Sequence, residues 1–339
     1  MVKRIISLAL AALLTVLCLA ACGGGSGNGT ETDENGNVVN NNSNGNGSSG
    51  NGNNNASGGG NSSGSNSNNN GSDEDLVDPT GRYTKFDLRT SYDATEAATV
   101  TFTDSAVTVQ GKGASADGTT LYINTKGTYR LTGSCSDGRI IVEVPTSDKV
   151  HLVFNGLKLE CKSNAAVWVK SADKTSITLV EGTVNSLSDS GAYKDTNADG
   201  EPNACLFSKD DITINGTGTL EVTGNVNNGI TSKDDLKIVS GTIKVTAKNH
   251  GIRGNDSVSI RDGVITIVAK NDGIKSSKED KENKGYIYIE GGTISIDAGD
   301  DCLQAPSDIT VTGGSITTDA GGKVVNCDGT TYFADGTLK

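Results

Sequence analysis

GITSKDDLKIVSGTIKVTAKNH, residues 229–250, is followed at once by GIRGNDSVSIRDGVITIVAKND, residues 251–272. The two segments have equal length and carry Gly-Ile, two apolar alternations and a glycine turn at matching positions. Recurrence at a fixed period of 22 residues indicates a repeat architecture. Because apolar and polar residues alternate within each unit, the pattern predicts short strands with one buried face.

The repeat extends in both directions from this pair. Units begin at positions 205, 229, 251, 273 and 302, and the longest interval contains a seven-residue insertion within the polar run 277–284. Three short strands in each coil of about 22 residues predict an all-β parallel β-helix, a solenoid of about nine or ten coils. Each coil is expected to stack ~4.8 Å from the one before it. A β-sandwich is disfavoured, because hairpins would not repeat the same side chains at this interval.

Composition agrees with a solenoid and excludes several function classes. Aromatic residues make up 4% of the 339 residues and hydrophobic residues 34%, so the core must consist of small aliphatic side chains in regular rows. The net charge of -12 argues against a nucleic-acid partner, because phosphates would be repelled. With only two histidines, a histidine-rich metal site or a histidine-based catalytic relay is not expected. A monomer is expected.

The N-terminal part of the sequence predicts a secretory signal followed by a disordered linker. Residues 1–21 have the charged start and apolar run of a secretory signal, and Leu19-Ala20-Ala21-Cys22 resembles a bacterial lipobox. Cys22 is therefore the expected lipidation site, and two acyl chains would anchor the protein on the extracellular side of the cell membrane. Residues 22–79, rich in Asn, Gly and Ser, predict a disordered linker, and residues 80–339 the folded domain.

A calcium site is predicted in the loop Asp195-Thr196-Asn197-Ala198-Asp199-Gly200-Glu201. Its D-x-N-x-D-G pattern matches the opening of an EF-hand-type loop, in which alternating oxygen ligands surround one hard cation. Position twelve is Leu206, so the usual bidentate glutamate is missing. Glu201 or a carboxylate of the next coil, such as Asp210, would have to complete the shell. A solvated acidic loop is the alternative.

The register of the repeat also stacks acidic side chains from successive coils. One row contains Asp210, Asp234 and Asp256, and one corner gathers Asp272, Asp300 and Asp301. Carboxylates ~4.8 Å apart repel one another, and a cation between coils would reverse the sign of that interaction. Both groups are candidate Ca²⁺ ligands. The alternative is that Asp and Asn only provide turns and side-chain ladders.

The outward positions of the short first strand form a candidate binding row. Its members are Trp168, Phe207, Thr231, Arg253, Lys275 and Gln304. Aromatic faces suit the apolar face of a sugar ring, and Arg and Lys pair with uronic carboxylates. The row therefore predicts a surface for a partly acidic glycan. Packing of Trp168 and Phe207 beneath the loop 189–203 is the alternative.

Two cysteines are expected to form a disulfide. Cys135 and Cys161 each stand six residues before an aligned inward residue, Ile141 and Val167. The two thiols should then lie on adjacent coils within bonding range, in an oxidising compartment.

Residues 92–323 resemble a family of secreted bacterial carbohydrate-binding β-helix domains. The stretches that carry the resemblance are GTYRLTG at 127–133, FNG at 154–156, DGEPNA at 199–204, SKDDITING at 208–216 and NGITSKDDL at 228–236. The resemblance implies a right-handed β-helix, bound calcium, and affinity for plant cell-wall polysaccharide such as pectic acid or cellulose.

The expected function is therefore calcium-assisted polysaccharide binding at the cell surface. The family's similarity to pectate lyases leaves a calcium-dependent lyase as the first alternative. Its base would be Lys275, Lys233 or Arg253. A non-catalytic adhesin or structural protein is the second.

Overall fold

The computed structural model describes residues 78–279 and 282–339. The predicted signal, the lipidation site at Cys22 and nearly all of the predicted linker lie outside these residues. No helix within the described ranges has the length and apolar character needed to span a membrane.

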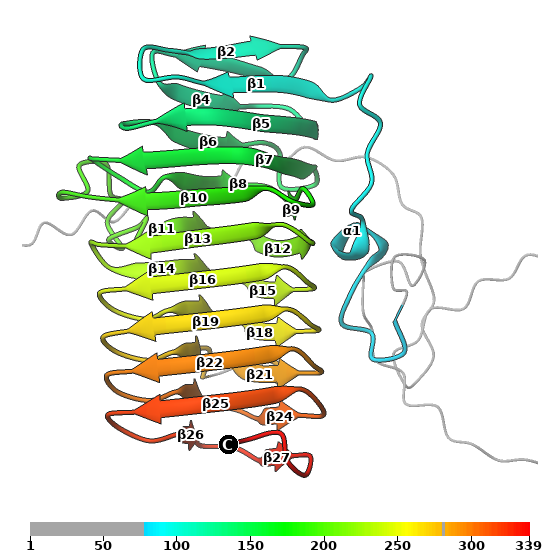
Figure 1. Ribbon diagram of the computed structural model, residues 1–339, viewed down its shortest axis with the longest axis vertical. Coiled ribbons are helices and arrows are strands. Elements are labelled where there is room, and N and C mark those ends of the chain that lie inside the picture. Colours follow the sequence, from blue (N-terminus) through cyan, green and yellow to red (C-terminus); the bar gives the residue numbers. More distant parts are fainter. Residues whose placement is uncertain (1–77, 280–281) are drawn as a thin grey trace, which may run out of the picture. The chain divides into compact units, whose positions relative to one another are not determined.

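The described chain folds as a parallel β-helix, as the repeat predicts (Figure 1). Its first face is a ten-stranded sheet. The first face consists of β3 (Ala114–Asp117), β4 (Thr120–Ile123), β6 (Arg139–Glu143), β8 (Val167–Ser171), β11 (Ala204–Ser208), β14 (Asn228–Ser232), β17 (Ile252–Gly254), β20 (Ile274–Ser276), β23 (Leu303–Ala305) and β26 (Val325–Cys327).

The other strands form one 17-stranded sheet that bends into a second and a third face. The second face consists of β9 (Lys174–Leu179), β12 (Asp211–Gly216), β15 (Asp235–Ile238), β18 (Ser257–Ile260), β21 (Tyr286–Ile289), β24 (Ile309–Val311) and β27 (Thr331–Phe333). The third face consists of β10 (Val184–Asp189), β13 (Thr219–Gly224), β16 (Thr242–Ala247), β19 (Val264–Ala269), β22 (Thr293–Ala298) and β25 (Ser315–Ala320). At the N-terminal end stand β1 (Ala98–Phe102), β2 (Val107–Gln110), β5 (Gly127–Cys135) and β7 (Lys149–Cys161).

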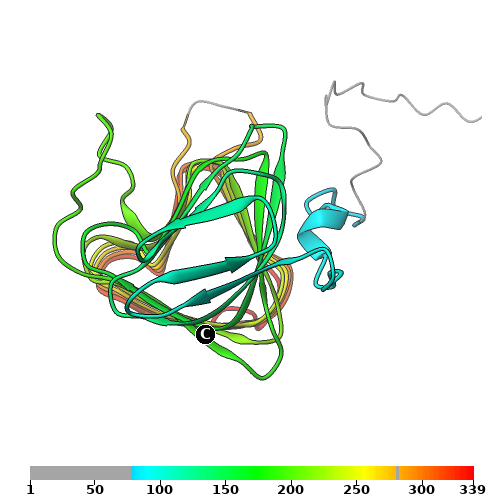
Figure 2. The same cartoon turned by 90° about the horizontal axis from the view of Figure 1, so that it is seen from above.

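Each coil of the second half contributes one strand to each face, and like residues pair with like. Ile230, Ile252, Ile274 and Leu303 are neighbours on the first face, and all four are fully buried. Burial of one such side chain stabilises the fold by about 1.5–3 kcal/mol. Rows of aliphatic side chains therefore replace the aromatic core that the composition lacks. Seen down the axis, successive coils superpose (Figure 2).

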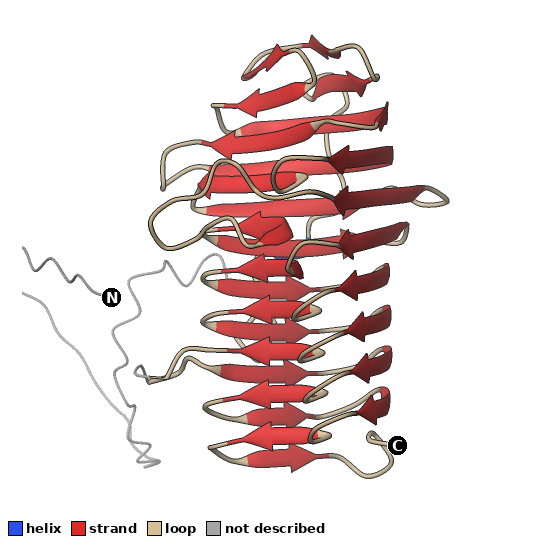
Figure 3. Cartoon of the chain, turned by 90° about the vertical axis from the view of Figure 1, so that its left-hand side faces the viewer, coloured by secondary structure: helices blue, strands red, loops and turns tan. Residues whose placement is uncertain are grey.

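Glycines form the corner between the second and third faces. Gly241 and Gly263 have φ angles of 111° and 129°, a region that side chains with a Cβ rarely adopt. A Cβ at Gly263 would also lie 2.8 Å from the carbonyl oxygen of Gly241, one coil away. The turn therefore requires glycine both for its backbone angle and for the close stacking of coils. Figure 3 shows the stacked coils from the side.

The predicted disulfide is wrong, since Cys135 and Cys161 are both buried free thiols. On the first face Ile140, not Ile141, pairs with Val167, an offset of 27 residues. Cys135 pairs with Leu159, an offset of only 24 residues, after a register shift beyond Leu131. The additional residues lie in the turn between β7 and β8. The sequence offset between neighbouring strands therefore differs from one face to the next.

Residues 78–97, here called the N-terminal strap, lie along the outside of the second face and include α1 (Lys85–Leu88) (Figure 1). Asp87, a residue of α1, is fully buried between the strap and the second face. Its carboxylate lies 3.1 Å from Lys174 Nζ and 3.4 Å from Lys237 Nζ, and it accepts a hydrogen bond of 2.6 Å from Thr213. Burial alone would raise the pKa of Asp87, but the two ammonium groups and Thr213 outweigh it and lower the pKa to about 2.

Candidate functional site

The predicted outward row exists on the first face, one residue per coil. Trp168 pairs with Phe207, Phe207 with Thr231, and Thr231 with Arg253. The row continues through Lys275 and Gln304 and ends at Asn326, which the sequence analysis did not single out.

The aromatic end of this row is covered. Phe207 is fully buried in a small cluster with Ala165 and Ala204, against which Tyr193 of the loop 189–203 packs. Trp168 is half-buried, and the ammonium of Lys170 lies 4.6 Å from the centre of its ring. Phe207 is therefore wrong as a ligand contact, because the loop seals it as ordinary packing.

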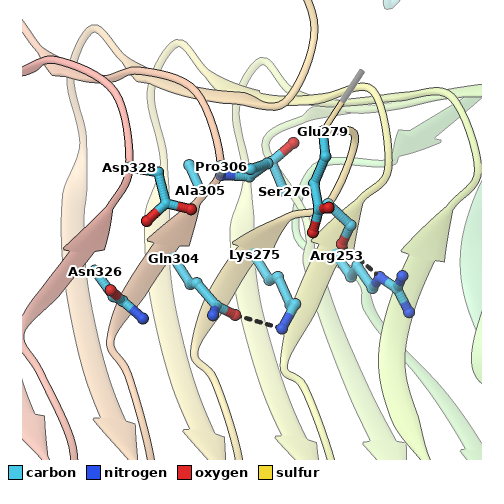
Figure 4. Close-up of a pocket in the computed structure, with 10 residues that line it drawn as sticks. Arg253, Lys275, Ser276, Glu279, Gln304, Ala305, Pro306, Asn326 and Asp328 are labelled. Carbon is cyan, nitrogen blue, oxygen red and sulfur yellow. Dashed lines mark hydrogen bonds between the residues drawn. The ribbon is translucent and has the colours of Figure 1, made fainter. Parts of the chain in front are cut away.

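The polar end of the row opens into a hollow of about 300 Å³ (Figure 4). Its lining includes Arg253, Lys275, Gln304, Asn326, Glu279 and Asp328. Lys275 donates to Gln304 Oε1, and Arg253 Nε donates to Ser277 Oγ at 2.9 Å. This first-face hollow thus joins three of the predicted ligand residues, the cations Arg253 and Lys275 and the amide Gln304, with the amide of Asn326 on the next coil.

A buried carboxylate stands behind the hollow. Asp272 Oδ2 lies 2.8 Å from Lys275 Nζ and 3.1 Å from His250 Nδ1. Burial would raise the pKa of Asp272, but its interactions with His250 and Lys275 lower the pKa to about 2. Asp272 is therefore an anion at neutral pH that holds the Lys275 ammonium in place.

The structure brings Asp272, Asp300 and Asp301 together, with carboxylate oxygens within 4.8 Å of one another. Asp300 is exposed, and Asp301 accepts hydrogen bonds from Lys323 N at 2.8 Å and Asn326 Nδ2 at 2.6 Å. Three carboxylates from two adjacent coils are the oxygen donors that Ca²⁺ prefers. This acidic corner offers carboxylate oxygens to a hard cation, and both oxygens of Asp272 and of Asp301 also accept hydrogen bonds from protein groups.

The loop predicted to bind calcium is held by protein donors instead. Asp195 pairs with Arg139 at 3.2 Å, and Glu201 pairs with Lys233 at 2.7 Å. Asn197 Oδ1 accepts from the backbone N–H groups of Asp199 and Glu201. The structure does not gather the carboxylates of this loop around one point, and Asp272, Asp300 and Asp301 form the only such group among the described residues.

The row of Asp210, Asp234 and Asp256 stacks as the repeat predicts. Burial and the carboxylates of Asp256 and Asp210 raise the pKa of Asp234. Lys284, from the insertion, contacts the Asp256 carboxylate. A lysine therefore neutralises part of this row.

The three candidate bases have different partners. Lys233 is paired with Glu201, Lys275 with Asp272, and Arg253 with Ser277. A general base must first be deprotonated. Burial lowers the pKa of Arg253. An arginine remains protonated in proteins, so Arg253 can bind an anion.

Comparisons with known proteins agree with this fold. A family model described as "Carbohydrate-binding domain-containing protein" matches residues 117–337. The chain is similar to a carbohydrate-binding domain-containing protein of Acetivibrio thermocellus, with 40% identity over 126 residues, which are 37% of this chain and 44% of that protein. It is also similar to a solved structure of the polysaccharide lyase-like protein from C. thermocellum, a gadolinium derivative. The TM-score is 0.70 and the identity 38%, over 71% of this chain and 98% of that one.

Proposed function

This chain belongs to the family of carbohydrate-binding domain-containing proteins, and we propose that it binds an acidic plant cell-wall polysaccharide of the pectic-acid class in the first-face hollow. The supporting observation is that Arg253 and Lys275 pair across neighbouring strands. Neighbouring coils lie ~4.8 Å apart, so the two cations can meet carboxylates along one glycan chain. Guanidinium and ammonium groups bind carboxylates through charge-assisted hydrogen bonds.

Cellulose fits this hollow less well. Recognition of a neutral glycan depends on exposed aromatic platforms, and the aromatic end of the row is covered by the loop 189–203 and Lys170. The open end presents cations, amides and carboxylates. An acidic chain that runs across several coils matches these groups.

We also propose that Ca²⁺ binds at the acidic corner and bridges Asp300 and Asp301 to glycan carboxylates. The corner lies beside the hollow, since Asn326 lines the hollow and also donates to Asp301. The similar structure is a gadolinium derivative, and lanthanides favour hard oxygen ligands, as Ca²⁺ does. When bound, the ion would supply positive charge where two sets of carboxylates meet.

Replacement of Lys275 by methionine is expected to weaken binding of polygalacturonate about ten- to hundredfold, because a hydrogen bond to a charged group contributes about 1.5–3 kcal/mol. Affinity electrophoresis in polygalacturonate gels measures the change. Lys244→Met is the matched control, since Lys244 is exposed on the third face and pairs with Glu221. Equal retardation of both variants and the wild-type chain would contradict the proposal.

The same substrate separates the alternative functions. Release of unsaturated uronides, followed by ultraviolet absorbance, would establish a lyase. Failure of every tested glycan to retard the wild-type chain would instead favour a structural protein or adhesin.

Ca²⁺ at a hundredfold excess over its Kd is expected to stabilise the wild-type domain by about 2.7 kcal/mol. Asp300→Asn should lose most of this gain, because Asp300 is an exposed member of the corner and its loss leaves the core intact. Thermal unfolding with Ca²⁺ or a chelator measures the effect. Asp335→Asn, at an exposed aspartate elsewhere, is the control, and an identical Ca²⁺ response in both variants would exclude the corner.

For the location of the protein we propose a lipid anchor at Cys22 on the extracellular side of the cell membrane. The lipobox-like sequence and the Asn/Gly/Ser-rich linker support this proposal. Incorporation of labelled palmitate into the full chain, lost in Cys22→Ala, tests it.

A further inference from the structure

The third face of the β-helix carries exposed apolar side chains. Three of the large hydrophobic residues that stay exposed in the described chain, Val184, Val264 and Val268, point outward from this face. The strap lies along the second face and the hollow opens on the first, whereas the third-face strands stand side by side in Figure 1 with the strap away from them. Isolated exposed valines are ordinary on a protein surface, so their arrangement decides whether they have a use.

The outward residues of four neighbouring strands, β10, β13, β16 and β19, form three rows that read nearly alike in both directions. The first row is Val184, Thr219, Thr242 and Val264; the middle row is Ser186, Glu221, Lys244 and Thr266; the last row is Ser188, Thr223, Thr246 and Val268. The first row has valine at both ends and threonine at both central positions. The middle row has a hydroxyl at each end and two opposite charges between them.

This pattern is complementary to a second copy of itself. A two-fold axis parallel to the strands and midway between β13 and β16 exchanges β13 with β16 and β10 with β19. Val184 of one copy then faces Val264 of the second copy, and the central threonines face threonines. Reciprocal contacts of this kind define an isologous two-fold interface.

The two charges of the middle row select the direction of packing. Within one copy, Lys244 Nζ and Glu221 Oε1 lie 3.0 Å apart on neighbouring strands. The same axis places each Lys244 opposite Glu221 of the second copy, so four charges of alternating sign form a square. With the two solenoids parallel, each Glu221 would instead face the other Glu221, and contacts between like charges disfavour such an arrangement.

We propose that the third face is the interface of a symmetric dimer, in which two copies pack face to face with their solenoids antiparallel. The overlap runs from β7 through β10, β13, β16 and β19 to β22. Strands ~4.8 Å apart and about six residues long make this surface ~29 Å by ~20 Å, so the two copies together bury roughly 1,100–1,200 Å². That area is at the low end for a specific interface, and a weak, reversible dimer is expected. The proposal differs from the monomer that the sequence analysis expects, and it does not depend on glycan binding.

Charges placed at the two ends of the first row test the dimer without disturbing the single chain, because Val184 and Val264 are 48% and 50% exposed. Val184→Asp and Val264→Arg, each alone, are expected to weaken association about ten- to hundredfold, because each sets an unpaired charge against a valine of the second copy. The double variant should recover most of the affinity, since the two new charges then meet across the interface. Within one copy the two positions lie three coils apart, ~14 Å, so the recovery cannot arise inside a single chain.

Sedimentation velocity over a concentration series measures the association. The full chain carries Cys22→Ala in every sample, so that no lipid is attached. Val324→Arg is the matched control, because Val324 is 38% exposed and lies outside the three rows. The control is expected to associate as the wild-type chain does.

Three results would overturn the dimer. The wild-type chain could remain a monomer at every concentration, the double variant could associate no better than the single variants, or Val324→Arg could weaken association as much as Val264→Arg. Because no glycan is present in these samples, each result leaves the proposed function open to its own test.

Discussion

Asp87→Asn is expected to weaken docking of the N-terminal strap by up to about 3–5 kcal/mol, since it removes the buried anion that two ammonium groups share. Lys174 and Lys237 then keep only their longer contacts, with Asp211 at 3.5 Å and Asp235 at 4.0 Å. Lys174 and Lys237 come from different coils and meet at this one carboxylate. The Leu88 amide, which donates to Thr84 O at 3.2 Å, reports on docking through its hydrogen-exchange protection. That protection should fall by up to about two to four orders of magnitude.

A compensated variant distinguishes the ion cluster from a general packing defect. Asp87→Leu combined with Lys174→Met and Lys237→Met removes all three charges at similar volume, and such replacements are often neutral or stabilising. Much of the Leu88 protection should therefore return. Asp93→Asn, at an exposed strap residue, is the control for a single carboxylate change. Unchanged protection in Asp87→Asn would show that the ion cluster does not hold the strap.

The repeat made the fold predictable, because every coil carries the same pattern of buried and exposed positions and so defines the strand register. Ile243, Ile265, Ile294 and Ile316 stand at the same place in successive repeats, and they pair in that order. The prediction failed where the chain departs from the repeat. Cys135 and Cys161 lie in the irregular first coils, where the offset differs between faces.

The site was predictable only in part, for a related reason. Sequence periodicity placed Arg253, Lys275 and Gln304 in one row, and the structure joins them in one hollow. It could not show that a loop would fold back and bury Phe207. The sequence analysis also missed Glu279 as a lining residue of the hollow. Glu279 lies in the polar run 277–284, and the seven-residue insertion there indicated a longer loop beside the row.

The strap was not foreseen because nothing in residues 78–97 repeats. In the sequence nothing distinguishes Asp87 from the other acidic residues, or Lys174 and Lys237 from exposed lysines. Their burial follows only from the path of a non-repetitive segment across several coils. Long-range ion pairs of this kind leave no spacing pattern in the sequence.

A chain of hydrogen bonds fixes the protonation of His151 beneath the strap. Arg89 Nη2 can only donate, so His151 Nδ1, 2.9 Å away, must accept. His151 Nε2 then carries the proton and donates to Thr178 Oγ1 at 2.7 Å, and Thr178 donates to Asn215 Oδ1 at 2.6 Å. Asn215 Nδ2 in turn donates to the backbone carbonyl oxygens of Asp87 and Arg89, so the hydrogen-bond chain returns to the strap. The docked strap therefore requires neutral imidazole.

Acidification is accordingly expected to loosen the strap between about pH 6.5 and pH 4. Burial, and next the Arg89 charge, lower the pKa of His151 to about 4 from its ordinary 6.5. The undocked state binds the proton first as the pH falls, so docking weakens by roughly 3 kcal/mol across this window. Asp87 stays ionised throughout, because its pKa is about 2.

His151→Gln should abolish this pH dependence, because glutamine can accept from Arg89 and donate to Thr178 but cannot titrate. Protection factors of the Leu88 amide between pH 7 and pH 4.5 measure it, with His250→Gln, the other histidine, as the control. Burial and the neighbouring Asp235 raise the pKa of Asp211, close to Lys174, so its protonation in the same range acts in the opposite direction. The difference between wild-type chain and His151→Gln removes that contribution, and parallel profiles for the two would refute the assignment.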